Sequence, residues 1–128
     1  MTTRRIFAVS LLLMLTGLFA YAQDAAKTVT VKGYLTDNMC AGSPTEDKDF
    51  AEDAKEHSVG CARMPHCVKS GYAVAEGRKL YKLDDAGNKL AAKVLKTTER
   101  EKGVMVEVEG TVEGTTLHVT KLVEVAAK

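Results

Sequence analysis

Sulfur and imidazole side chains gather in one short part of this sequence. All three cysteines and two of the three histidines lie between residues 39 and 67, in the set Met39, Cys40, His57, Cys61, Met64, His66 and Cys67. Thiolates and imidazoles bind zinc, and a mixture of sulfur and imidazole donors also suits copper. Three thiolates and one imidazole would complete a tetrahedral site. The candidate metal ligands are therefore Cys40, His57, Cys61 and Cys67, with Met64 as an auxiliary donor.

The spacing of the cysteines matches no familiar zinc pattern, which favours a different interpretation. Twenty residues separate Cys40 from Cys61, and five separate Cys61 from Cys67. In an oxidising compartment cysteines normally pair, and a disulfide contributes on the order of 2–4 kcal/mol. The favoured pairing joins Cys61 to either of the other two. The third thiol would then stay free or link two chains into a covalent dimer.

Other polar residues have simpler interpretations. His57 shares a helical face with two apolar residues, where a hydrogen-bonded core histidine is the commoner case. Asp37 and Asn38 indicate a sharp turn more than a pair of oxygen ligands. His118 is expected to point outward from a strand and has no assigned role. The chain contains no C-x-x-C, G-x-S-x-G, H-E-x-x-H or phosphate-loop motif, so we predict that it is not an enzyme.

The first 22 residues have the composition of a secretory signal peptide. Residues 1–5 carry two arginines and no acidic residue, and residues 6–19 are apolar apart from Ser10, Thr16 and Gly17. Ala20-Tyr21-Ala22 provides a small-x-small cleavage site before Gln23. The apolar run is too short to span a bilayer. We therefore expect a periplasmic or secreted protein that keeps no stable membrane anchor after cleavage.

Residues 23–128 have the length of one domain, and their charge excludes some partners. They contain 16 basic and 17 acidic residues, so the whole-domain field does not attract nucleic acid or anionic membranes. Residues 78–102 are locally basic, with eight basic and four acidic side chains. Binding of single-stranded nucleic acid also needs exposed aromatic platforms, and this part of the chain has few aromatic residues. We predict no nucleic-acid partner.

The first elements that must position the cysteines follow from periodicity and capping signals. Residues 28–37 alternate apolar and polar side chains, as expected of a strand, and Gly33 indicates a bend or bulge. Ser43-Pro44-Thr45-Glu46 has the pattern of a capping box and predicts the start of an acidic helix. Residues 61–69 are expected to form a short helix or a knotted loop around Pro65.

The rest of the chain alternates between strand and helix patterns. Residues 72–76 and 79–83 predict two short strands that turn at Gly77, with Tyr72, Val74, Tyr81 and Leu83 as candidates for the buried faces. Residues 84–88 predict a turn, and residues 90–95 a short amphipathic helix. Residues 104–112 and 117–125 predict a long hairpin that turns at Glu113-Gly114. Gly110 falls inside the first of these strands, where it would allow curvature.

This order of elements predicts a mainly β protein. Five strands with a helix between the third and the fourth are the order of the OB-fold, a small Greek-key barrel. We predict a five-stranded OB-like barrel with a helical, cysteine-bearing insertion, residues 38–71, after the first strand. The alternative architecture is an open meander with helices on one face.

Four segments carry a resemblance to known proteins. They are Asp37-x-x-Cys40-Ala41, His57-x-x-x-Cys61-Ala62-x-Met64-Pro65-x-Cys67, Leu80-Tyr81-Lys82-Leu83-Asp84, and Gly110-Thr111-Val112-Glu113-Gly114. With these segments the chain resembles a group of small exported bacterial proteins of unknown function with OB-like barrels. The resemblance implies the barrel fold and a cysteine block that acts as one unit. It implies no catalytic residue.

Three functions are compatible with these observations. The first is a non-enzymatic periplasmic binding or envelope module whose insertion is closed by a disulfide and whose partner is an unidentified small ligand or envelope protein. The second is a periplasmic copper or zinc binding protein that uses the Cys/His/Met cluster. The third is a thiol redox protein, which would need an unpaired cysteine with a depressed pKa.

Overall fold

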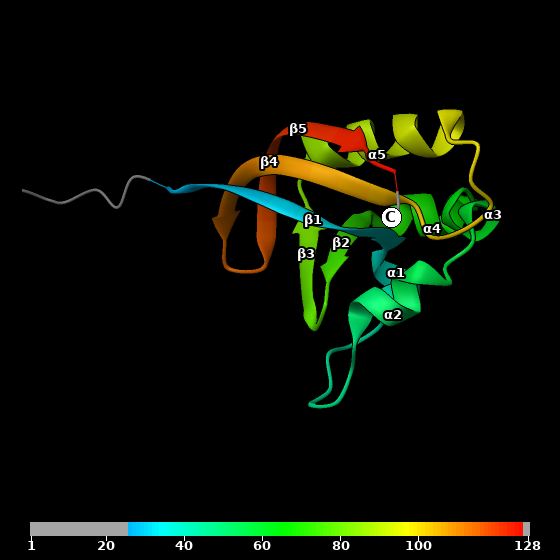
Figure 1. Cartoon of the computed structure of the whole chain (residues 1–128), viewed down its shortest axis with the longest axis horizontal. Coiled ribbons are helices and arrows are strands. Elements are labelled where there is room, and N and C mark those ends of the chain that lie inside the picture. Colours follow the sequence, from blue (N-terminus) through cyan, green and yellow to red (C-terminus); the bar gives the residue numbers. More distant parts are fainter. Residues whose placement is uncertain (1–25, 127–128) are drawn as a thin grey trace, which may run out of the picture.

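Five strands form one sheet that closes on itself. The computed structural model describes residues 26–126, and the predicted signal peptide, residues 1–22, lies outside that range. The strands are β1 (Thr28–Asp37), β2 (Tyr72–Glu76), β3 (Lys79–Leu83), β4 (Met105–Glu113) and β5 (Thr116–Glu124). They pair in the order β1-β2-β3-β5-β4, and β4 pairs again with β1 (Figure 1). Only the β3–β5 pair is parallel. We call this closed sheet the ring.

Five helices accompany the ring. Four short ones lie between β1 and β2, namely α1 (Asn38–Ala41), α2 (Phe50–Lys55), α3 (Val59–Ala62) and α4 (Pro65–Ser70). The longer α5 (Asp85–Thr97) connects β3 to β4. The predicted helix between β3 and β4 and the predicted helical insertion after β1 are confirmed, but the class is mixed α/β rather than mainly β. Within residues 26–126, no helix has both the length and the apolar character that crossing a membrane requires.

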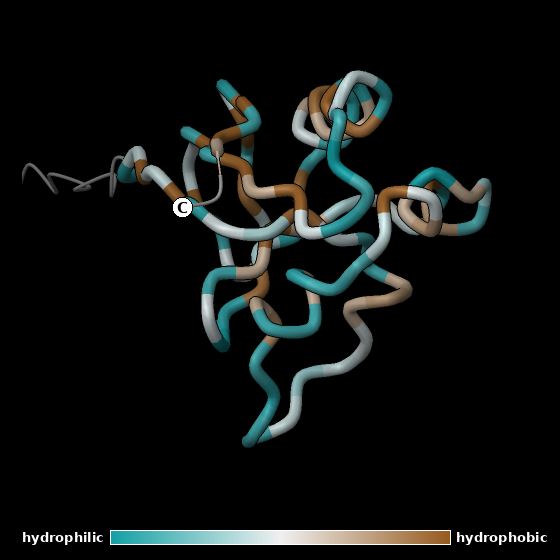
Figure 2. The backbone as a smooth tube through the Cα atoms, turned by 45° about the vertical axis from the view of Figure 1, so that its right-hand side comes forward, coloured by the Kyte–Doolittle hydropathy of each residue, from teal (hydrophilic) through white to brown (hydrophobic). Residues whose placement is uncertain are grey.

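The core fills the inside of the ring. Strand residues that alternate along the sequence point inward, and Val74, Val106, Val108 and Leu117 are fully buried there. The helix α5 closes one side of this core with Ala91 and Leu95, while α1 and α2 lie on the opposite side (Figure 1). Hydrophobic segments follow the strands and α5, and the tip of the loop after α1 is hydrophilic (Figure 2).

Two glycines allow neighbouring strands to approach closely, as the sequence predicted for bends. A side chain at Gly33 would place its Cβ 2.2 Å from the carbonyl oxygen of Ala75 in β2. A side chain at Gly110 would come within 2.1 Å of the carbonyl oxygen of His118. The β4–β5 register shifts between Glu109 and Gly110, which is an irregularity of the kind that bends a strand.

Two predicted helix starts are wrong. The capping box at residues 43–46 is not helical, and α2 begins at Phe50 because the Asp49 carboxylate accepts hydrogen bonds from two amides of the first turn. The helix α5 begins at Asp85 rather than at residue 90. There the Asp84 carboxylate caps the first turn, so most of the predicted turn over residues 84–88 is helical.

Candidate metal centre

The end of β1 places a buried carboxylate at the base of the insertion. Asp37 is the last residue of β1, pairs with Tyr72 of β2 and is 0% exposed. Its Oδ1 accepts a hydrogen bond from the Cys40 amide at 2.9 Å, so the same side chain caps α1. Its Oδ2 has no hydrogen-bond partner. A carboxylate buried in this way requires compensation by a cation or another donor.

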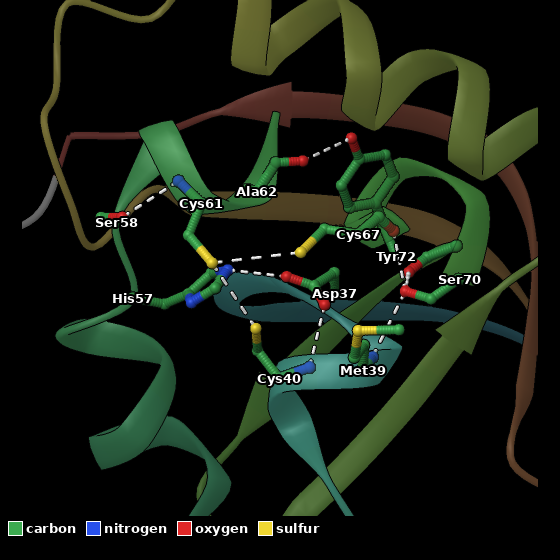
Figure 3. A network of polar contacts seen from close by, with 11 residues as sticks. Asp37, Met39, Cys40, His57, Ser58, Cys61, Ala62, Cys67, Ser70 and Tyr72 are labelled. Atoms are coloured by element: carbon green, nitrogen blue, oxygen red, sulfur yellow. Dashed lines mark hydrogen bonds and ion pairs between the residues drawn. The ribbon is translucent and has the colours of Figure 1, made fainter. Parts of the chain in front are cut away.

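Cys40 is positioned by contacts between α1 and α4. The Asn38 amide donates to the Gly71 carbonyl at 2.9 Å, and the Met39 amide donates to the Ser70 hydroxyl at 3.3 Å. These bonds hold the four-residue α1 against the end of α4. Cys40 is exposed as a residue, but its sulfur points toward the other thiols (Figure 3).

Cys61 lies on α3, which is held at both ends. The Ser58 hydroxyl caps the helix by accepting a hydrogen bond from the Cys61 amide at 3.1 Å. At the other end, the buried Tyr72 hydroxyl donates to the Ala62 carbonyl at 3.0 Å. The Val59 amide also donates to the Glu101 carbonyl, which ties α3 to the segment before β4.

Cys67 approaches the same point from α4. The sequence left a short helix or a knotted loop open for residues 61–69, and the structure has two helices there, α3 and α4, because Pro65 begins a new helix at the position where its missing amide costs nothing. Cys67 is 0% exposed. The Ser70 hydroxyl donates to the Cys67 carbonyl at 2.7 Å. The same hydroxyl accepts the hydrogen bond from the Met39 amide, so it links α4 to α1.

The three thiols and the carboxylate form one compact group of donors. The Cys40 and Cys61 sulfurs are 3.7 Å apart, and the Cys61 and Cys67 sulfurs are 4.0 Å apart. One carboxylate oxygen of Asp37 and the three sulfurs lie within 4.8 Å of one another (Figure 3). All three cysteines are free thiols in the structure. This group, Asp37, Cys40, Cys61 and Cys67, is able to hold a metal ion, and we call it the thiol cluster.

Burial and negative charge keep the Cys40 and Cys67 thiols protonated in the absence of a metal. Burial of the sulfur, the contact with Cys61 and the Asp37 charge raise the pKa of Cys40 to about 12. Burial and then the Asp37 charge also raise the pKa of Cys67 above its ordinary value. The same two causes raise the pKa of Tyr72. A cation placed among these groups would reverse the effect and stabilise the thiolates.

His57 reaches the thiol cluster through Asp37. Its Nε2 lies 2.9 Å from Oδ2 of Asp37, although the contact lacks the geometry of a hydrogen bond. The imidazole is 11% exposed. The backbone position of His57 is fixed by Gly103, whose amide donates to the His57 carbonyl at 3.2 Å. An imidazole beside a ligating carboxylate is a common outer partner of metal ligands.

The structure brings together most of the residues that the sequence selected. Cys40, Cys61 and Cys67 converge directly, and His57 stands beside them. Met39, Met64 and His66 are exposed at the surface. His118 is half exposed and lies near Glu113 and Asp84.

Asp37 is the site residue that the sequence analysis assigned to a turn in preference to an oxygen ligand. Its cap on α1 agrees with the predicted turn, but the cap occupies only one of its two oxygens. The available signal was the spacing Asp37-x-x-Cys40, since an aspartate three residues before a cysteine can cap the helix that carries the thiol.

Comparison of the chain with family models, with curated proteins and with solved structures finds no significant match. The function is therefore inferred from the geometry of the chain itself.

Proposed function

We propose that this protein binds one thiophilic metal ion, zinc before copper(I), in the thiol cluster. The observation that carries the proposal is the spacing of the sulfur atoms. Two thiolates bound to one metal at about 2.3 Å with a tetrahedral angle lie about 3.8 Å from each other. The separations of 3.7 Å and 4.0 Å match that value on both sides of Cys61.

The buried carboxylate favours zinc over copper(I). Zinc accepts oxygen, nitrogen and sulfur ligands, whereas copper(I) is selected by soft sulfur donors. Asp37 lies within ligand reach of the three sulfurs, and its Oδ2 lacks a hydrogen bond. A divalent ion would also offset more of the negative charge of three thiolates and one carboxylate than a monovalent ion would. His57 would then act as the outer partner of Asp37.

Four protein donors leave no open position on a tetrahedral ion. Structural and storage sites are closed in this way, whereas catalytic zinc keeps a position for water or substrate. This supports the prediction that the protein is not an enzyme. It favours a role in holding or carrying metal, with the ion also joining α1, α3 and α4 to the end of β1.

The competing functions have weaker support from the same residues. A redox role requires a thiol with a lowered pKa, and the pKa values of Cys40 and Cys67 are raised. A disulfide requires a sulfur separation of about 2.0 Å, shorter than either distance to Cys61, and would leave the third cysteine without a partner. A disulfide-stapled binding module is nevertheless the second candidate, because export would expose the thiols to oxidation.

The scaffold and the location complete the proposal. The strand order, with β3 parallel to β5 and a helix between β3 and β4, agrees with an OB-like barrel, so we assign the ring to that architecture. We also propose that residues 1–22 direct export and are removed before Gln23. The protein would then acquire its metal in the periplasm or outside the cell.

Cobalt substitution tests the proposed ligand set. The reduced chain is titrated with Co²⁺, whose spectrum reports tetrahedral geometry and thiolate bonds, and zinc is then added in competition. We expect one Co²⁺ per chain, thiolate charge-transfer bands and displacement by zinc. Binding without those bands, or no stoichiometric binding, would contradict the proposal.

Two aspartate-to-asparagine variants separate the ligand role of Asp37 from its capping role. Asp37→Asn keeps an oxygen that can cap α1 but removes the charge, so we expect zinc binding to weaken at least tenfold. Asp84→Asn is the matched control, because Asp84 caps α5 in the same way and lies outside the thiol cluster. Equal zinc affinity in the two variants would remove Asp37 from the ligand set.

A further inference from the structure

A second candidate site lies on the outer surface of the ring, beyond the thiol cluster. A cleft of about 510 Å³ separates the loop after α1 from β3 and the β4–β5 turn. Its walls include Pro44, Phe50, Leu80 and Thr115, with Arg78 and Lys82 at either end of the β3 wall. Small-molecule sites in proteins typically have volumes of about 300–1,000 Å³, so the cleft has the right size.

The alternation of β3 explains why these side chains share one wall. Successive strand residues point to opposite faces, so Leu80 and Lys82 face outward together, and Arg78, in the turn just before β3, lines the same cleft. Leu83, of the opposite parity, is buried in the core inside the ring. This wall therefore presents a cation, an apolar side chain and a second cation in turn. About 13 Å separate the Cα atoms of Arg78 and Lys82.

The floor of the cleft is apolar and firmly held. Phe50 is 4% exposed and packs with Ala75 of β2, and Leu80 packs against the same small cluster. Ala75 and Leu80 are directly paired across β2 and β3. Because Phe50 is nearly buried, it offers no exposed ring on which a nucleic-acid base could stack.

The two cations at the cleft have no acidic partner. Within residues 26–126, neither Arg78 nor Lys82 forms an ion pair, and none of the residues that line the cleft is acidic. The nearby Lys48 is already engaged, since its ammonium donates to the Ala41 carbonyl at 2.6 Å and lies 3.6 Å from Asp53. Two unpaired cations beside an apolar floor are complementary to an anion with an apolar body.

We propose that this cleft binds a small amphiphilic anion, a carboxylate or a phosphate attached to a short apolar chain. The apolar chain would lie on Leu80 and Pro44, above the nearly buried Phe50. Arg78 would bind the head group through two parallel hydrogen bonds, and Lys82 would add a point charge. This proposal is independent of the metal, because none of the four thiol-cluster residues lines the cleft.

The test is a titration of the isotopically labelled, zinc-treated chain followed by amide NMR shifts. The probes are octanoate, octyl phosphate, neutral octanol and inorganic phosphate. We expect one or both amphiphilic anions to bind saturably and to shift the amides of residues 42, 43, 78–82 and 115. Octanol and inorganic phosphate should each bind at least about fivefold more weakly, since each lacks half of the recognised chemistry. The ratio between octanoate and octyl phosphate identifies the preferred head group.

Charge-removal variants decide whether the cleft is responsible. Arg78→Ala and Lys82→Ala should each weaken anion binding at least about fivefold, because each removes a charged contact from an exposed position. Lys89→Ala is the matched control, since Lys89 is exposed on α5 and does not line the cleft. It should bind like the unmodified chain.

Several outcomes would overturn the proposal. These are octanol binding as tightly as the anions, shifts confined to another face, or unchanged affinity in both Arg78→Ala and Lys82→Ala. Saturable binding of a short oligothymidine at these residues, with no binding of the amphiphiles, would assign the cleft to nucleic acid instead.

Discussion

The ring and the insertion, residues 38–71, are held together by different interactions. The ring buries a continuous apolar core and its strands are joined by backbone pairing, so its order follows from packing. The insertion is divided into four helices of four to six residues each. Isolated helices of that length are not stable in water.

What holds the insertion is mostly polar. Side chains cap α1, α2 and α3, and α1, α3 and α4 meet at the thiol cluster rather than at a second large core. Apolar contacts add to this in two helices: Phe50 and Ala54 of α2 pack on Ala75, and Val59 and Ala62 of α3 belong to the main core. We therefore expect the ring to fold without metal, and the insertion to be ordered largely by the metal ion that its thiols bind.

The largest expected effect is the loss of metal in Cys61→Ser. Cys61 is the only cysteine in contact with both other thiols, so its removal breaks both sulfur pairs. We expect zinc affinity to fall more than about a hundredfold, beyond the usual effect of an outer partner. Equilibrium competition with a chromophoric chelator measures it. The unfolding transition of the ring should remain cooperative, and retained stoichiometric zinc would contradict the ligand assignment.

The converse variant is Leu117→Ala, which disturbs only the ring. Leu117 is 0% exposed inside the core, and the cavity should lower the free energy of unfolding by about 2–5 kcal/mol. Chemical denaturation with and without zinc measures the change. The metal stoichiometry should stay at one per chain below the transition, and a parallel loss of zinc would show that the two regions are not separable.

Changing the pH should have opposite effects on zinc binding and on the stability of the metal-free chain. The raised pKa values of Cys40 and Cys67 mean that zinc must displace at least two protons, so zinc affinity should rise about a hundredfold per pH unit near neutrality. Calorimetry in buffers of different ionisation enthalpy counts the released protons. Fewer than two would argue against both thiols as ligands.

The metal-free chain has the reverse dependence at high pH. Folding keeps the Cys40 proton up to a pKa of about 12, whereas the unfolded thiol loses its proton near 9.0. The corresponding stability is therefore present below pH 9 and is lost as the pH rises from there toward 12. Denaturation of the metal-free chain across this range measures the loss, which should be smaller in Cys40→Ser, where the raised pKa values of Cys67 and Tyr72 still contribute.

A smaller effect is expected from His57→Gln. This change removes the imidazole beside Oδ2 of Asp37 but leaves the three sulfurs in place. Zinc affinity should fall about 10- to 100-fold, the usual range for an outer partner. The cobalt spectrum should keep its thiolate bands. A complete loss of those bands would instead make His57 a direct ligand, as the sequence suggested.

The smallest effects on stability and zinc affinity are expected when two helix caps are removed. Ser58→Ala and Asp49→Ala each remove a cap from a short helix of the insertion and should each cost about 1 kcal/mol of stability. Only Ser58 holds the amide of a thiol-cluster residue, Cys61. We therefore expect weaker zinc binding in Ser58→Ala alone, measured by the same chelator competition. Equal zinc affinity in both variants would mean that α3 does not need its cap to present the thiol.

The same comparison explains how much the sequence predicted. Alternating residues such as Val106 and Val108 reveal the strands because each inward side chain enters one shared core. The start of α2 was harder to predict, because the loop before it contains both Ser43 and Asp49. The helix is capped by Asp49 and not by the predicted Ser43. The cysteine block was identified by composition, but the inclusion of Asp37 depended on the distance between β1 and α3, which no local pattern contains.

The most direct test of the metal site combines two mass measurements on one sample. The chain is purified without chelator, its native mass is recorded, and it is then denatured and alkylated without reductant. Our account predicts one zinc ion per native chain and three alkylated cysteines after denaturation. A metal-free chain that is two hydrogens lighter, with a single alkylated cysteine, would contradict it and establish the disulfide instead.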